Sequence, residues 1–106
     1  MARWLTDAGW RVVERRARSS TGGEVDIVAV DPHDTLVAIE VRARRSVRAG
    51  AAATTVDARK VARLRRTLAT IGSGGAHAHH GLRVDLVTAE PVNERTAWHL
   101  VRVPGI

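Results

Sequence analysis

Acidic, basic and aliphatic side chains alternate in two neighbouring stretches of the chain. The stretch "EVDIVAV" carries Glu24 and Asp26, and the stretch "LVAIEVRA" carries Glu40 and Arg42. Carboxylate oxygens suit Mg²⁺ and Mn²⁺, and a guanidinium binds phosphate through two donors at once. These residue types could therefore hold a divalent cation and position a phosphate, as metal-assisted chemistry on a phosphodiester requires.

The spacing of the two stretches predicts that they form an antiparallel hairpin with residues 31–35 as its loop. Counted outward from the loop, the facing pairs are Val30 with Leu36, Val28 with Ala38, Asp26 with Glu40, and Glu24 with Arg42. Because side chains alternate between the two sides of a strand, all of these share one face. The other face is aliphatic and is expected to be the core, formed by Val25, Ile27, Val37, Ile39 and Val41.

In this register, Glu24 opposite Arg42 makes an ordinary ion pair, whereas Asp26 opposite Glu40 brings two like charges together. Two remedies are open: one carboxylate takes up a proton, or a divalent cation lies between them. A solvated network of charges on an open sheet face remains the alternative interpretation of the same pattern.

The whole chain reads as α-β-β-β-α-β-β, which predicts an α/β fold with helices around a mixed sheet. The helix over residues 57–71 is the clearest element, since its apolar residues Val61, Leu64, Leu68 and Ile71 form one stripe. Thr54 or Thr55 is expected to cap its start and Gly72 to end it. The remaining elements are expected at residues 2–8, 10–18, 24–30, 35–42, 82–88 and 96–103.

Composition narrows the classes of function. The chain of 106 residues is long enough for one domain, expected to span residues 1–106, and it carries 17 Lys and Arg against 11 Asp and Glu. This excess of basic residues, all of them arginine except Lys60, makes nucleic acid the first partner to test and an anionic membrane the second. A coding sequence that favours Arg and Ala is the alternative explanation. The absence of Cys excludes thiolate metal sites, and three Trp with no Phe or Tyr argue against a base-stacking platform. With no bilayer-length apolar run and no signal-peptide pattern, a cytoplasmic location is expected.

Basic residues gather on the helix over residues 57–71, where Arg59, Lys60, Arg63 and Arg66 lie opposite most of the apolar stripe. Arg44 and Arg45 directly follow the strand that carries Glu40. These six residues are candidates for contacts with the phosphates of a nucleic acid. A solvated helix face and a basic loop are the alternatives.

The segments "GGEVDIVAV", "LVAIEVRAR", "VDARKVARL" and "LRVDLV" resemble, in order and approximate spacing, the YraN-like family of small bacterial proteins. That family is assigned to the PD-(D/E)xK endonuclease superfamily, and the resemblance covers roughly residues 2–90. It implies a restriction-endonuclease-like αβββαβ core. It also implies that Asp26 and Glu40 bind a metal and that Glu24, Arg42 and Lys60 match the acidic and basic positions around them.

One departure from the family pattern affects the chemistry. The family usually has Lys where this chain has Arg42, and a guanidinium does not deprotonate in proteins. Arg42 is therefore excluded as a general base, but it could still orient a phosphate and stabilise charge that develops on it. A water activated by the cation would then have to supply the nucleophile.

Two hypotheses follow. The first is an endonuclease dependent on Mg²⁺ or Mn²⁺ that acts on branched or single-stranded DNA in repair or recombination, with Asp26, Glu40 and Arg42 at the catalytic centre and Glu24 as a further metal ligand. The second is a nucleic-acid-binding module with the same fold and impaired chemistry, which the arginine at position 42 favours. A homodimer would suit a junction substrate, although nothing in the sequence demands one.

Overall fold

The computed structural model describes residues 1–19, 22–43, 57–73, 80–91 and 98–106. The predicted order of elements is confirmed, and the fold is α/β, compatible with a restriction-endonuclease-like core. The elements are α1 (Ala2–Asp7), β1 (Arg11–Arg18), β2 (Glu24–Val30), β3 (Thr35–Ala43), α2 (Ala58–Ser73), β4 (Gly81–Pro91) and β5 (Trp98–Val103).

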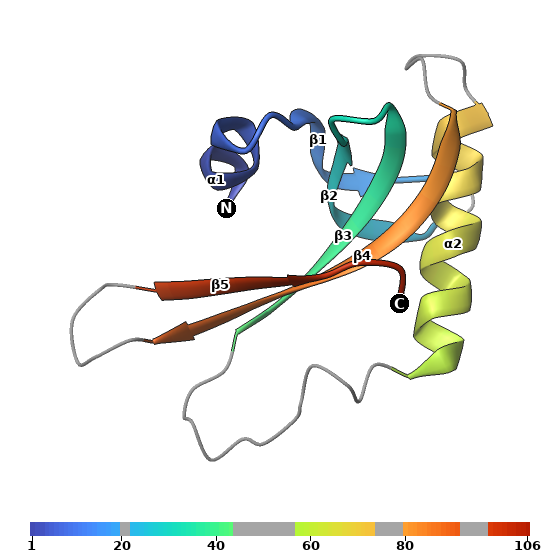
Figure 1. Ribbon diagram of the computed structural model, residues 1–106. Helices are drawn as coiled ribbons and strands as arrows, with labels where there is room; N and C mark the ends of the chain where they lie inside the picture. Colours follow the sequence, from blue (N-terminus) through green and yellow to red (C-terminus); the bar gives the residue numbers. More distant parts are fainter. Residues whose placement is uncertain (20–21, 44–56, 74–79, 92–97) are drawn as a thin grey trace.

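The strands form one mixed sheet in the order β1-β2-β3-β4-β5 (Figure 1). The pair β3 and β4 is parallel, because α2 connects them, and the other neighbouring strands are antiparallel. Among the described helices, none is long and apolar enough to cross a membrane.

Helix α2 begins where the side chain of Asp57 accepts a hydrogen bond of 2.9 Å from the backbone N–H of Arg59. Asp57 therefore acts as the cap that satisfies a free N–H of the first turn. The expected caps Thr54 and Thr55 lie outside the described residues. The helix continues through Gly72 to Ser73, so the predicted end at Gly72 was one residue early.

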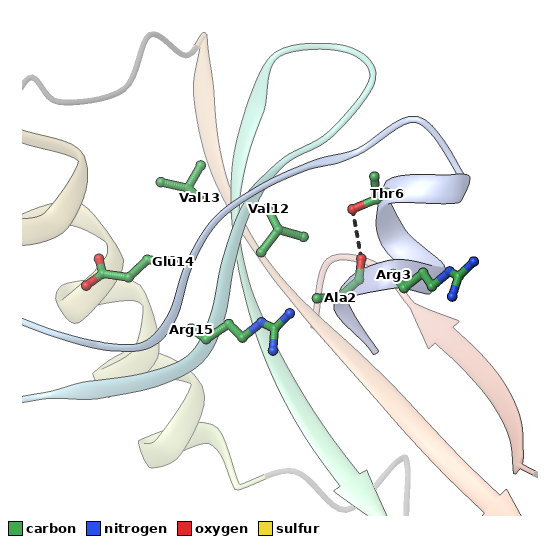
Figure 2. Close-up of a pocket in the computed structure, with 7 residues that line it drawn as sticks. All are labelled: Ala2, Arg3, Thr6, Val12, Val13, Glu14 and Arg15. Atoms are coloured by element: carbon green, nitrogen blue, oxygen red, sulfur yellow. Dashed lines mark hydrogen bonds between the residues drawn. The ribbon is translucent and has the colours of Figure 1, made fainter.

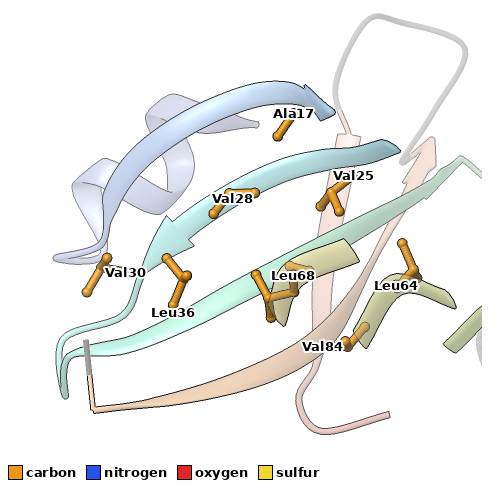
Figure 3. Close-up of a cluster of buried hydrophobic side chains, with 9 residues drawn as sticks. Ala17, Val25, Val28, Val30, Leu36, Leu64, Leu68 and Val84 are labelled. Carbon is orange, nitrogen blue, oxygen red and sulfur yellow. The ribbon is translucent and has the colours of Figure 1, made fainter. Parts of the chain in front are cut away.

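Both faces of the sheet are buried, not only the aliphatic face that the sequence indicated. Leu64 and Leu68 of α2 pack on one face, against a cluster that also contains Ala17, Val25, Val28, Val30, Leu36, Ala38 and Val84 (Figure 3). Leu5 of α1 and Trp10 pack on the other face, with Ile27, Ala29, Val37, Ile39 and Val87. Because α2 covers the face that carries Glu40, that carboxylate is buried and not on an open surface.

Val25 lies on the α2 side, although strict alternation would place it with Ile27 on the α1 side. The alternation of β2 therefore breaks between Val25 and Ile27. The neighbouring strand is irregular at the same level, where Arg16 has a φ of 50° between the pairs Arg15–Ile27 and Ala17–Val25. A non-glycine residue with positive φ is uncommon, and here it interrupts the pairing of β1 with β2, which resumes at Ala17–Val25. The irregularity surrounds Asp26 and separates it from the regular ladder.

Candidate active site

Glu40 lies in β3 beneath the first turn of α2 and is only 8% exposed. Its Oε1 atom forms an ion pair of 2.5 Å with Nζ of Lys60. The side chain of Lys60 remains 34% exposed, so the ammonium is near solvent while the carboxylate is not. An ammonium at this distance offsets much of the cost of burying a carboxylate.

Asp26 is half-buried, and its Oδ2 atom accepts a hydrogen bond of 2.9 Å from the backbone N–H of Val41. The recorded β2–β3 pairs run from Val30–Leu36 to Ile27–Ile39. Beyond Ile39, the side chain of Asp26 takes the place of a backbone acceptor. Its carboxylate consequently lies beside the peptide group that joins Glu40 to Val41.

The predicted register is confirmed for Val30–Leu36 and Val28–Ala38. The extension that placed Asp26 opposite Glu40 is not part of the recorded ladder. Neither a shared proton nor a cation is needed to separate the two charges, because each carboxylate has its own partner: the N–H of Val41 for Asp26 and the ammonium of Lys60 for Glu40.

The predicted ion pair between Glu24 and Arg42 is wrong. Glu24 lies directly opposite Arg18 on β1, and its Oε2 atom is 3.8 Å from Nε of Arg18. The reason is the same break in β2, which ends the recorded pairing with β3 before Glu24 is reached. Both side chains are well exposed, so the pair contributes little to stability.

Arg42 is half-buried and lies two residues after Glu40 on the same strand. Within the described part of the chain, its guanidinium has no hydrogen-bond or ion-pair partner. Its donors are therefore not engaged by another described residue. Because side chains two apart on a strand share a face, these donors are next to the buried carboxylate of Glu40.

Arg59, Arg63 and Arg66 are exposed on α2, and none of them forms an ion pair with another described residue. Arg63 and Arg66 line a pocket of about 450 Å³ together with Thr67, Thr70 and the turn residues Gly22 and Gly23. Lys60 differs from Arg59, Arg63 and Arg66, since its ammonium forms an ion pair with Glu40. Arg44 and Arg45 lie outside the described residues.

The donor set near Glu40 fits a hard divalent cation with two protein ligands. Asp26 Oδ1 and Glu40 Oε2 have no recorded partner among the described atoms and are oxygen ligands of the kind that Mg²⁺ prefers. No group of three His, Cys, Asp or Glu that could hold a metal occurs in the described ranges. Water and substrate oxygens would therefore complete the coordination, which is usual for Mg²⁺.

A second charged cluster, which the sequence only partly indicated, lies on the α1 face of the sheet. Asp85 is fully buried and accepts hydrogen bonds from Nε and Nη2 of Arg83, at 2.7 and 3.0 Å. Asp85 and Arg83 are two residues apart on one strand and share a face, so sequence spacing is a signal for this pair. Asp85 also accepts from Nη1 of Arg102, and Arg83 donates to Asp31, each at 3.0 Å. No local pattern could have found these two contacts, because they join residues far apart in the chain.

Two members of the cluster, Asp31 and Arg83, have shifted pKa values. Burial alone would raise the pKa of Asp31, but the backbone N–H groups of Thr35 and His33 and the guanidinium of Arg83 together bring it below its ordinary value. The hydrogen bond to Asp85 raises the pKa of Arg83. Both groups are consequently charged at neutral pH.

Figure 2 shows another pocket, of about 510 Å³, between α1 and β1. Arg3 and Arg15 extend beside it, and Glu14 extends toward the α2 side. None of the predicted catalytic or metal-binding residues lines this pocket.

Comparisons with known proteins point to one family. A family model described as uncharacterised protein family UPF0102 matches residues 1–89. A UPF0102 protein of Kineococcus radiotolerans is 52% identical over 109 residues, which cover 98% of this chain and 84% of that protein.

Two further UPF0102 proteins are similar over most of the chain. That of Streptomyces coelicolor is 46% identical over 92 residues, 81% of this chain and 66% of the relative. That of Burkholderia pseudomallei strain 1106a is 40% identical over 100 residues, 91% of this chain and 64% of the relative. The chain thus spans about two thirds of the length of these two relatives.

Proposed function

The chain belongs to the UPF0102 family, the YraN-like family that its motifs resemble, and we propose that it is a metal-dependent endonuclease-like protein acting on DNA phosphodiester bonds. The observation that carries the proposal is the meeting of three elements at one point. Asp26 of β2 binds the N–H of Val41, directly after Glu40 of β3, and Glu40 binds Lys60 of α2.

In the proposed site, Asp26 and Glu40 would hold Mg²⁺ or Mn²⁺, which when bound would supply Lewis acidity toward a phosphoryl oxygen and lower the pKa of a water. Glu24 is proposed to act only through water, because its carboxylate is turned toward Arg18 on β1.

Lys60 and Arg42 divide the work that one lysine does in the usual family pattern. The guanidinium of Arg42 has free donors and orients the scissile phosphate through two of them. The ammonium of Lys60 holds Glu40 in one orientation.

DNA is the proposed partner because the formal charge is +6 and because three arginines of α2, Arg59, Arg63 and Arg66, form no ion pair with another described residue. Arg59, Arg63 and Arg66 would contact backbone phosphates on the side of α2, and Arg44 and Arg45 those beyond the end of β3. A cytoplasmic location and a homodimer on branched DNA belong to the same proposal.

A nucleic-acid-binding module without cleavage is the second candidate. The pair between Glu40 and Lys60 favours it, because a carboxylate already neutralised by an ammonium has less need of a cation. The endonuclease and the binding module predict the same DNA affinity, and they differ in whether the bound DNA is cleaved.

The test is cleavage of flap, junction and single-stranded DNA with Mg²⁺ or Mn²⁺, using Asp26→Asn and Glu40→Gln. Asp7→Asn and Glu14→Gln are matched controls, since both residues are exposed and distant from β3 in the chain. We expect both site variants to lose cleavage by at least about a hundredfold while keeping DNA affinity. Cleavage that persists in both would refute the metal site, and DNA binding without cleavage by the parent protein would favour the binding module.

A further inference from the structure

A third pocket, of about 570 Å³, lies on the α1 face of the sheet, close to the loop of the β2–β3 hairpin. Its apolar walls include Trp4, Trp10, Pro32 and Pro104, and its charged residues include Arg83 and Arg102. None of the residues of the proposed active site lines it. Its volume is in the range that holds small molecules and cofactors.

Arg83 is held by structural contacts at each of its three guanidinium nitrogens. Its Nε and Nη2 atoms bind Asp85 at 2.7 and 3.0 Å, and its Nη1 atom binds Asp31 at 3.0 Å. Every nitrogen of the guanidinium therefore donates to a carboxylate. Arg83 holds the wall of the pocket and is a poor candidate for a ligand contact.

Arg102 is only partly occupied. Its Nη1 atom binds Asp85 at 3.0 Å, whereas Nε and Nη2 have no partner in the described part of the chain. The carbon between its nitrogens is 5.3 Å from the centre of the Trp10 ring, within the range of a cation–π contact. The side chain is 34% exposed. Asp85 and Trp10 hold the guanidinium on two sides, and its remaining edge is accessible to a ligand.

The carboxylates of the cluster do not oppose an anion at this position. Asp85 is fully buried and accepts four hydrogen bonds: two from Arg83, one from Arg102 and one from the backbone N–H of Gly105. Asp31 accepts from two backbone N–H groups and from Arg83. Both carboxylates thus face N–H donors, and their charges are compensated by the two guanidinium groups.

An indole, two prolines and a half-free guanidinium suit a ligand that combines a flat ring with one anionic group. We propose that this pocket binds a single nucleotide unit, with its base against Trp4 and Pro32 and its phosphate on Nε and Nη2 of Arg102. A nucleotide is favoured over a simple aromatic acid because a phosphate offers several oxygens to a guanidinium fork, and because every base has a face that stacks on an indole. The site needs no metal and goes beyond the proposed cleavage site, which is on the opposite face of the sheet.

The test is equilibrium dialysis of the intact protein with deoxyadenosine 5′-monophosphate in the presence of EDTA. Deoxyadenosine, inorganic phosphate and benzoate are the comparison ligands, because they supply the base alone, the anion alone and an aromatic acid. We expect the nucleotide to bind at least about tenfold more tightly than each of them. Equal binding of benzoate or of inorganic phosphate would overturn the assignment.

Two variants locate the binding. Arg102→Gln is expected to weaken nucleotide binding at least about tenfold, and it leaves Asp85 with three of its four hydrogen bonds. Trp4→Leu removes the proposed stacking surface, and Trp4 is only partly buried. We expect this variant to weaken nucleotide binding to a similar extent.

Arg11→Gln is the matched control, since Arg11 is exposed and does not line the pocket. Asp26→Asn should bind the nucleotide normally, which separates this proposal from the cleavage proposal. Unchanged affinity in folded Trp4→Leu protein would refute the site even if Arg102→Gln failed to fold.

Discussion

At the scale of single residues, three carboxylates in the described part of the chain, the buried Glu40 and Asp85 and the half-buried Asp26, have polar partners. Glu40 has Lys60, Asp26 has the N–H of Val41, and Asp85 has two guanidinium groups. Buried ionic groups add little net stability compared with apolar residues, but removing one partner is costly. The stability of these residues therefore depends on complete pairs.

Lys60→Met tests the pair at Glu40. The substitution leaves Glu40, which is 8% exposed, without its ammonium partner. We expect the free energy of unfolding to fall by about 1–3 kcal/mol. This loss is smaller than for a fully buried pair, because Lys60 is partly exposed. Urea denaturation at pH 7 measures it. The double variant Glu40→Leu/Lys60→Met should recover most of the loss, and equal stability of Lys60→Met and the parent would contradict the pair.

Asp31 should make the protein sensitive to acid. The pKa of Asp31 is lowered in the folded state. Its contribution to the free energy of unfolding is therefore present at neutral pH and is lost as the pH falls below the ordinary range of aspartate, about pH 4. Asp31→Asn should therefore lower stability at pH 7 and make the decline between pH 5 and about pH 3 shallower. Urea denaturation over this range checks the prediction, and parallel curves for the two proteins would contradict it.

At the scale of elements, the site depends on how closely α2 approaches the sheet. Gly23, just before β2, lies against the buried Thr67 of α2. A Cβ atom at Gly23 would overlap Thr67 Oγ1, so the close approach requires glycine. The same docking of α2 brings Lys60 to Glu40.

Gly23→Ala should consequently disturb both packing and site. We expect the free energy of unfolding to fall by about 1–3 kcal/mol, which thermal or urea unfolding measures. If the proposed activity is present, we also expect weaker cleavage. Gly81→Ala is the control, because nothing lies within 4 Å of the Cβ position there. Adding Thr67→Ala should restore part of the stability of Gly23→Ala, and failure to do so would show that the overlap is not the cause.

At the scale of the whole molecule, the formal charge of +6 attracts polyanions, but charge alone does not select a face. The positions of Arg59, Arg63 and Arg66 on α2 imply that the helix face carries the contacts. An equal loss of charge elsewhere should then have a smaller effect on DNA binding.

The triple variant Arg59→Gln/Arg63→Gln/Arg66→Gln tests this face. Its DNA affinity should fall, and the slope of log affinity against log salt should become shallower by about 2–3, since each lost phosphate contact removes about 0.7–0.9. The matched control replaces Arg3, Arg11 and Arg15, three exposed arginines of α1 and β1, with Gln. Equal slopes for the two triple variants would show that only net charge matters.

Local patterns in the sequence were sufficient for the elements. The apolar stripe that includes Leu64 and Leu68 predicted α2, and the short hairpin loop predicted the pairs Val30–Leu36 and Val28–Ala38. These features depend on residues close in the chain, so spacing and hydrophobic periodicity reveal them. The candidate carboxylates and basic residues could also be identified by residue type. The binding of a metal and of DNA stays a prediction.

The sequence by itself determined which segments become helices and strands and which residues could do chemistry, because both follow from neighbouring side chains. Only the tertiary structure decided the partners of the charges. Strict alternation placed Asp26 opposite Glu40 and Glu24 opposite Arg42, whereas the break at Arg16 and Asp26 and the close docking of α2 pair Glu40 with Lys60 and Glu24 with Arg18. The physical reason is that these pairings depend on packing between elements, where one irregular residue changes the face of every side chain beyond it.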